Sequence, residues 1–283
     1  QYKLSVPATL IESLDGEIVV QQTKTSGLER GDILLSINGE DIYQMINDLY
    51  PYVAASNHAG KLHRIFPLLL RSEGSPLEIS CLRNGKELAL KIEDFTHDLN
   101  GKNPEETSRK TWTDYAPGAA DIAYIDVGTM SKKTTEDILR KSRDGRGLIL
   151  DFRKYPNHFS MFELCDQYIA CRKDKYSWAS QNEKVFPGNY KFLGEGTTGD
   201  QNHNQDYYKG KIAILVDEGT MSHGECCVMM YSKSLQNKVI GSITAGADGN
   251  IGYFYLPGNM KFTYTALGWY YPDWGVCQRK GIH

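Results

Sequence analysis

The spacing of hydrophobic and polar residues changes character near residue 121. Before this point, short segments alternate apolar and polar residues and end at Gly or Asn, which is typical of strands joined by tight turns. After it, continuous apolar runs alternate with stretches of helical spacing. This second pattern predicts strand–helix–strand units built on a parallel or mixed sheet. The sequence therefore predicts a mixed α/β chain with two parts of different architecture.

Residues 1–95 form the first part. Its clearest segment is 26–40, in which Ile33, Leu35 and Ile37 alternate toward a core and Asn38-Gly39 makes a tight hairpin turn. Further strands are predicted over 17–21, 77–82 and 88–92. Helical spacing over 41–49 and 62–70 lies between them. This part therefore combines a small sheet with a helical insertion.

Residues 96–120 are polar and contain Asn100-Gly101, Asn103-Pro104 and Pro117, which predicts a linker with one edge strand. Residues 121–283 form the second part. The elements predicted in it are strands over 122–127, 147–151, 212–216 and 239–243, and helices over 134–142, 160–171 and from 225 onward. Two further strands, 254–257 and 262–265, are expected to continue the same sheet. The polar segment 194–210, which contains His203, is expected to form a lid-like loop.

The candidate chemistry lies where the buried strand 212–216 turns into the helix that starts near Glu225. Ser222 sits in this turn, where its hydroxyl is exposed while backbone N–H groups and the helix dipole face a developing oxyanion. Ser222 is therefore a candidate nucleophile. The same residues also match a capping box, with Ser222 at the N-cap and Glu225 three residues later. The spacing alone leaves both interpretations open.

Composition narrows the class of protein. With 24% charged residues and a net charge of −3, no basic patch is implied, which argues against nucleic acid as a partner. No apolar run approaches the ~20 residues that span a bilayer. The six cysteines lack metal-ligand spacing, so buried free thiols are expected and neither a metal nor another cofactor is predicted. The chain starts at Gln1 without a signal peptide, which suggests a processed piece that has lost any export signal or anchor.

Two motifs together resemble one known family. The Ser-x-x-Glu pattern after a buried strand is similar to the nucleophile region of the carboxy-terminal processing (tail-specific) serine proteases. The pattern GL-x-x-GD-x-I-x-x-ING over 27–39 resembles the PDZ module that precedes the protease domain in that family. The resemblance implies an elaborated PDZ domain over 1–95 and a protease domain of the ClpP/crotonase-like type over 121–283.

The family resemblance also implies a function. We expect a serine endopeptidase that cleaves extended or unfolded polypeptides, with the PDZ domain recruiting or gating the substrate. Gly27 and Leu28 would then contribute to binding peptides or protein C-termini. The family's usual setting implies the bacterial periplasm or cell envelope. The alternative is a catalytically degenerate protein of the same fold that binds or scaffolds peptides without cleaving them.

The resemblance assigns roles to further residues. Residues 151–158 resemble the family's D-h-R-x-N-P-G-G segment, which supplies a backbone N–H to the oxyanion hole, although Asn157 and His158 replace the two glycines. The backbone N–H groups of Asn157 and His223 are therefore expected to hold the oxyanion. Glu225 is expected to act as the cap partner, as a carboxylate at the helix dipole or as the residue that orients the base.

The resemblance leaves the general base open. The turn that carries the catalytic lysine in the tail-specific branch has Ala247 at the lysine position, and alanine cannot accept a proton. The turn resembles more closely the tricorn-core-like branch, whose base is a histidine before the PDZ domain; here it would lie upstream of residue 1. Gln278 falls near that branch's acidic residue. Within the chain His158 is the candidate base, and the alternative is an ordinary loop histidine.

Overall fold

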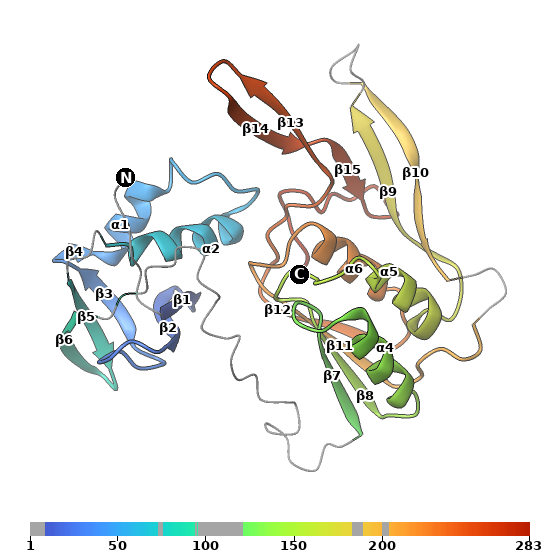
Figure 1. Ribbon diagram of the computed structural model, residues 1–283, viewed down its shortest axis with the longest axis horizontal. Helices are drawn as coiled ribbons and strands as arrows, with labels where there is room; N and C mark the ends of the chain where they lie inside the picture. The colour runs from blue at the N-terminus through green and yellow to red at the C-terminus, as the bar shows by residue number, and fades with distance from the viewer. Residues whose placement is uncertain (1–8, 73–75, 94, 96–120, 183–188, 200–203) are drawn as a thin grey trace. The chain divides into compact units, whose positions relative to one another are not determined.

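The computed structural model describes residues 9–72, 76–93, 95, 121–182, 189–199 and 204–283 (Figure 1). The predicted linker and His203 lie outside the described residues. The chain divides into two compact units, residues 1–109 (unit 1) and 110–283 (unit 2). No helix among the described residues is long and apolar enough to span a membrane.

Unit 1 is an antiparallel sheet with two helices. The strands run in the order β1 (Thr9–Leu14), β2 (Glu17–Thr23), β3 (Ile33–Ile37), β5 (Leu77–Arg83) and β6 (Lys86–Ile92), and β4 (Glu40–Asp41) pairs with β3. Tight turns join neighbouring strands where Asn38, Gly39, Asn84 and Gly85 adopt positive φ. The predicted strands in this part are therefore confirmed.

The register of β3 corrects one expectation. A bulge opposite β5 between Leu34 and Ser36 shifts the alternation, so that Leu34 and Ile37 are buried while Leu35 is not. Helix α1 (Ile42–Leu49) starts at Asp41, whose carboxylate accepts hydrogen bonds from two backbone N–H groups of the first turn. Helix α2 (His58–Leu69) starts earlier than its apolar pattern predicts because Asn57 caps it.

The centre of unit 2 is a four-stranded sheet in the order β12-β11-β8-β7, and every pair in it is parallel. The strands are β7 (Ile122–Asp126), β8 (Gly147–Asp151), β11 (Lys211–Val216) and β12 (Asn237–Gly241). Helices α4 (Lys132–Lys141) and α6 (His223–Tyr231) are crossovers between parallel neighbours, as predicted. The helix predicted over 160–171 is instead a short α5 (Met161–Leu164) that continues as a π-helical turn, η2 (Cys165–Ile169).

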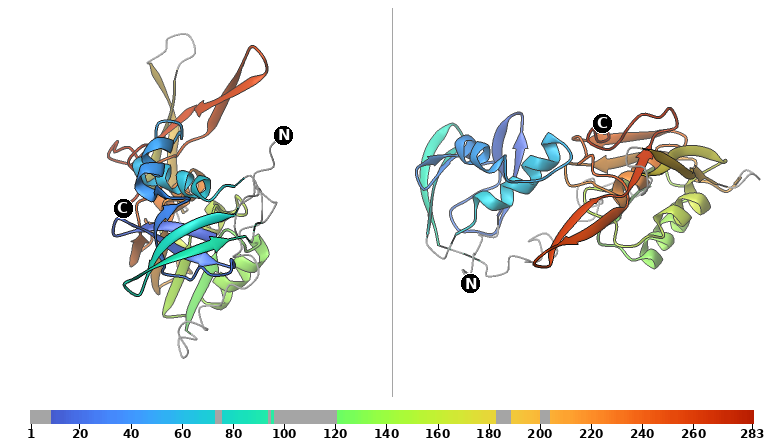
Figure 2. Two further views of the ribbon diagram at one scale, coloured as in Figure 1. Left: turned by 90° about the vertical axis from the view of Figure 1, so that its left-hand side faces the viewer. Right: turned by 90° about the horizontal axis from the view of Figure 1, so that it is seen from above.

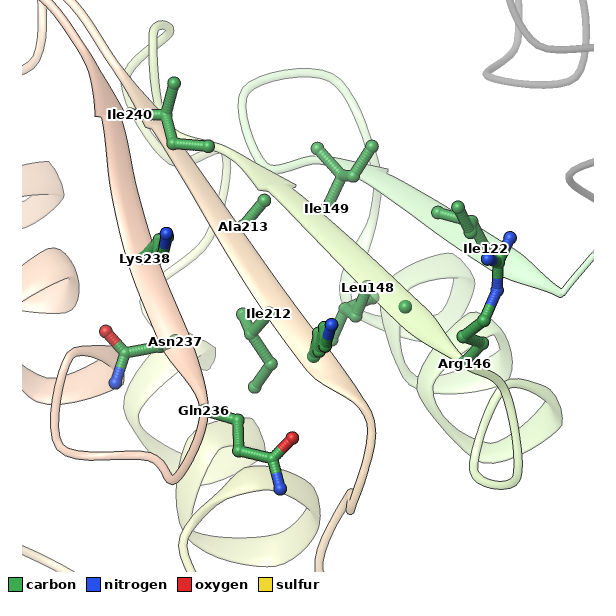
Figure 3. A pocket seen from close by; sticks show the side chains of 12 residues that line it. Ile122, Arg146, Leu148, Ile149, Ile212, Ala213, Gln236, Asn237, Lys238 and Ile240 are labelled. Carbon is green, nitrogen blue, oxygen red and sulfur yellow. The ribbon is translucent and has the colours of Figure 1, made fainter.

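Helices cover one face of this parallel sheet. Leu148, Leu150, Ile212, Ile214 and Val216 point into that face and pack with α6 residues such as Val228 and Met230 in one core. The alternate residues Ile149, Ala213 and Ile240 point to the other face, where they line a shallow cleft of about 610 Å³ (Figure 3). Five of the six cysteines are buried, and all six are free thiols, as predicted.

Two parts of unit 2 differ from the prediction. Strands β9 (Asp174–Asn182) and β10 (Tyr190–Thr198) form a three-stranded antiparallel sheet with β15 (Leu267–Tyr270), so the segment predicted as a loop over 194–210 begins inside a strand. Strands β13 (Ile251–Leu256) and β14 (Met260–Thr265) do not continue the parallel sheet. They pair only with each other and extend from the unit as a separate hairpin (Figures 1 and 2).

Candidate active site

Three loops meet at the carboxyl ends of β8, β11 and β12. The Thr220 hydroxyl, after β11, donates to the Phe152 carbonyl oxygen at 2.9 Å after β8. The Ala245 N–H, after β12, donates to the Thr220 carbonyl oxygen at 3.0 Å. Thr220 is buried and joins all three loops. The carboxyl edge of a parallel sheet is the usual place for a site in this architecture.

Ser222 follows Thr220 closely and has a strained backbone, with φ 51° and ψ −119°. The N-caps of α1 and α4, Asp41 and Ser131, have the extended conformation that an ordinary cap adopts. A non-glycine residue at positive φ costs free energy, on the order of 1–3 kcal/mol, and such residues concentrate at functional sites. A strained serine between a buried strand and a helix is the geometry of a nucleophile elbow.

Glu225 is fully buried one turn into α6, and its carboxylate is a hydrogen-bond acceptor for the surrounding loops. It accepts from the Thr244 hydroxyl at 2.5 Å and from the Gly246 and Ala247 backbone N–H groups at 2.8 and 2.9 Å. The Ser222 N–H also donates to it at 3.3 Å, so that Ser222 and Glu225 form the predicted capping box. Burial raises the pKa of Glu225, and these hydrogen bonds oppose the rise. Glu225 thus holds the turn 244–247 against the start of α6.

Ala247 lies directly beside Ser222. The Ser222 N–H donates to the Ala247 carbonyl oxygen at 3.1 Å, and the Ala247 side chain is half-buried. By resemblance this position matches the one that carries lysine in the tail-specific branch, and here it holds only a methyl group beside the candidate nucleophile. Among the described residues no hydrogen bond joins the Ser222 hydroxyl to the ring of a histidine.

The two histidines of this region lie close to each other. The His223 ring is buried between Phe159 and Phe162, at centroid distances of 4.6 and 4.9 Å, and its Nε2 lies 3.7 Å from the Cys227 sulfur. Burial lowers the pKa of both His223 and His158. At His158 the positive charge of Lys132 lowers the pKa further. Both nitrogens of the His158 ring are buried without a hydrogen-bond partner in the described part of the chain. Both imidazoles are therefore neutral near pH 7.

The structure corrects the expected oxyanion donors. The Asn157 N–H donates to the Val127 carbonyl oxygen at 2.8 Å, so in this conformation it cannot hold an oxyanion. This bond fixes the loop after β8 against the end of β7. The next N–H in the loop belongs to His158, and no hydrogen bond to another described residue uses it. The role expected for the His223 N–H stays a prediction.

A second buried carboxylate lies beneath the site. Asp248 accepts from the Gly249 N–H at 2.7 Å and from the Cys226 thiol at 3.3 Å. Burial raises the pKa of Asp248 to about 7, and the nearby charge of Glu225 adds to the rise. Burial therefore keeps Asp248 protonated to a higher pH than an exposed aspartate.

The residues expected to bind peptides in unit 1 have structural partners. Leu28 is buried in the core, and the Gly27 carbonyl oxygen accepts from Arg83 at 2.7 Å. Arg83 also donates to both oxygens of buried Asp32, at 2.7 Å each. This contact ties the loop 27–32 to β5. The Leu28 side chain is thus unavailable to a peptide in this conformation, and a peptide-binding role for Gly27 stays a prediction.

The shallow cleft on the other face of the parallel sheet is not the candidate active site. Its lining includes Arg146 and Asn237 at the amino ends of the parallel strands (Figure 3), whereas Ser222 follows the carboxyl end of β11. No group of three or more metal-ligating side chains occurs in the residues that the structure describes.

Comparison with known protein families identifies the family of this chain. The model of peptidase family S41 matches residues 121–283. The chain therefore belongs to peptidase family S41, a family of serine peptidases that includes the C-terminal processing proteases. No curated protein sequence matches the chain.

Solved structures share the fold at low sequence identity. Mature CPAF complexed with lactacystin is similar at a TM-score of 0.69 and 11% identity, over 99% of this chain and 78% of that one. Mature CPAF alone gives 0.68 and 12%, over 99% and 77%. The photosystem II D1 C-terminal processing protease gives 0.50 and 15%, over 100% and 72%. At these identities the likeness concerns the fold alone.

Several residues of the site were not found from the sequence. Thr244 and Asp248 lie in the turn that contains Ala247, for which the sequence gave these two residues no role, yet both are buried beside α6. Phe159 and Phe162, which enclose His223, have no distinguishing local pattern. Their role depends on the loop after β8 folding onto the start of α6, which no short-range signal predicts.

Proposed function

We propose that this chain is a serine endopeptidase of the carboxy-terminal processing type, with Ser222 as the nucleophile. The observation that carries the proposal is the strained backbone of Ser222 at the β11–α6 junction of a family S41 domain. An ordinary cap gains nothing from such strain, whereas a nucleophile gains exposure and alignment. The substrate would be an extended polypeptide, since endopeptidases act on an accessible scissile bond, and unit 1 would recruit or gate it.

In the proposed reaction the Ser222 Oγ attacks the scissile carbonyl carbon and its proton passes to a base. The negative charge that forms on the carbonyl oxygen would be held by the His223 N–H at the start of α6 and by the His158 N–H of the β8 loop. The peptide C–N bond then breaks, the base returns the proton to the leaving amine, and water hydrolyses the acyl-enzyme.

His158 is the base we propose within this chain. Its neutral imidazole can accept a proton near pH 7, and its ring nitrogens are not used by another described residue. The resemblance to the tricorn-core-like branch supports a different source, a histidine outside residues 1–283. If His158 is the base, Ser222 is activated in the 283-residue chain by itself. If the base lies outside residues 1–283, Ser222 in this chain is not activated.

The second candidate function is peptide binding without cleavage. Ala247 at the position of the family's lysine, and the lack of a histidine bonded to the Ser222 hydroxyl in the described residues, support it. In that case Ser222 and Glu225 would serve only to start α6.

Labelling with a fluorophosphonate tests these proposals because the probe reacts only with an activated serine. We expect labelling of the chain that Ser222→Ala abolishes and His158→Gln reduces by about a hundredfold or more. Thr129→Ala provides a control at a hydroxyl outside the site. Labelling that depends on Ser222 but not on His158 would assign the base elsewhere. A chain that stays unlabelled while binding peptides would favour the second candidate.

A further inference from the structure

The β13–β14 hairpin carries an apolar face that the described core of its own unit does not cover. Cross-strand partners share a face of an antiparallel pair, and the register pairs Phe254 with Phe262 and Leu256 with Met260. Tyr264 lies on the same face, opposite Gly252. These five large side chains are each between 40% and 57% exposed. Phe254 stacks on Phe262 at a centroid distance of 5.7 Å, which makes the face continuous.

The hairpin lacks the support that such a structure needs. Among the described elements, neither strand makes a substantial contact with any element except the other, and no hairpin residue belongs to the core of the unit. A two-stranded sheet alone is only marginally stable in water. The hairpin is attached at its base, where the Ala266 N–H donates to the Asn250 carbonyl oxygen at 2.8 Å. A surface that covers the apolar face would therefore stabilise the folded hairpin.

The chemistry of the face restricts what can cover it. Lys261 is the single charged residue of 251–265, and it lies on the opposite face, with its Nζ 4.5 Å from the Tyr253 ring centroid. A charged partner, such as a nucleic acid or an acidic peptide, would gain no ion pair on the apolar face. The opposite face is more polar, because it carries Lys261, Thr263 and Thr265 beside its tyrosines. The covering surface must itself be apolar and uncharged.

We propose that the apolar face of the β13–β14 hairpin packs against the same face of a second copy of this chain. The aromatic pair Phe254–Phe262 and the aliphatic pair Leu256–Met260 lie next to each other along the hairpin. A two-fold axis between the pairs sets the aromatic pair of each copy against the aliphatic pair of the other. Such an isologous contact uses one patch twice and closes on itself.

The area of the contact reaches the lower limit for a specific dimer. A fully covered aromatic side chain buries about 150–250 Å², so five large side chains at half exposure leave about 500 Å² to cover. Two copies bury about 1,000 Å² through these side chains alone, which is about the least area that a specific interface needs. Covering the face also removes an exposed apolar hairpin that would otherwise promote aggregation.

Sedimentation velocity of the 283-residue chain over a concentration series tests this interface. We expect the mass to rise from 31.9 kDa toward twice that value as concentration increases. Phe254→Ser with Phe262→Ser removes the aromatic pair and should weaken the dimer by about a hundredfold or more. The matched variant Tyr253→Ser with Tyr255→Ser removes two aromatic rings from the opposite face and should leave the dimer intact. Urea unfolding of both variants verifies that the core of unit 2 is folded.

Two results would overturn the proposal, and neither depends on peptidase activity. A wild-type chain that remains at 31.9 kDa at every concentration would mean that something other than a second copy covers the face. A dimer that responds equally to the two double variants, or only to the one at Tyr253 and Tyr255, would place the interface elsewhere.

Discussion

Ser222 and Ala247 lie side by side, with the Ser222 N–H donating to the Ala247 carbonyl oxygen at 3.1 Å. The contact brings the turn after β12 against the start of α6. A side chain longer than alanine at position 247 would therefore start beside the candidate nucleophile. This relationship allows a base to be added beside Ser222 and its effect on the reactivity of Ser222 to be measured.

Replacing Ala247 with lysine should activate Ser222. The amine would accept the hydroxyl proton as in a serine–lysine dyad, and a positioned base typically contributes at least about a hundredfold. The rate of fluorophosphonate labelling measures the effect. Ala247→Met, which has similar bulk and no amine, is the control. An equal rise in both variants would assign the change to altered packing rather than to a base.

Replacing Glu225 with glutamine should destabilise unit 2 strongly. Each carboxylate oxygen accepts hydrogen bonds, and an amide would turn one acceptor into a donor that faces backbone N–H groups or the Thr244 hydroxyl. We expect a loss of about 2–4 kcal/mol in the free energy of unfolding, measured in urea. Glu163→Gln, at an exposed ion pair with Lys132, should leave that free energy nearly unchanged. Similar losses in both variants would contradict the role of Glu225.

Asp248 should make the stability depend on pH. Burial raises its pKa from 3.8 to about 7, so between about pH 4 and pH 7 the native state keeps a proton that the unfolded chain releases. Stability contributed by this proton is therefore lost as pH rises through that window, by about 2–4 kcal/mol in total. Asp248→Asn should remove this loss, as shown by urea unfolding at several pH values. Asp144→Asn, at an exposed site, should retain it.

Gly241 should tolerate no side chain at the end of β12. Its φ is +137°, and an added Cβ would lie 1.9 Å from the Val216 carbonyl oxygen, which belongs to the strand that leads to Ser222. Gly241→Ala should cost about 3 kcal/mol or more because backbone must move. Gly258→Ala, also at positive φ but with open space around it, should cost about 1 kcal/mol. Thermal unfolding compares the two, and equal losses would mean that φ alone sets the cost.

Within unit 2, local pattern predicted the parallel strands well but missed the antiparallel strands β9 and β10. The continuous apolar run over 147–151 coincides with β8 because a strand buried between two neighbours needs apolar residues throughout. Strands β9 and β10 contain Gly, Ser, Thr and Lys residues and are held by pairing with each other and with β15. Pairing between distant segments leaves little trace in either strand alone, so these strands were missed.

By itself the sequence determined the two-part organisation, the parallel strands and the position of Ser222 between a buried strand and a helix. These depend on the period of apolar residues, which is a local property. The tertiary structure alone decided the strained φ of Ser222, the use of the Asn157 N–H by Val127 and the contact with Ala247. Those features depend on which loops meet at the carboxyl edge of the sheet, because a backbone group can bond only to the partner that folding brings to it.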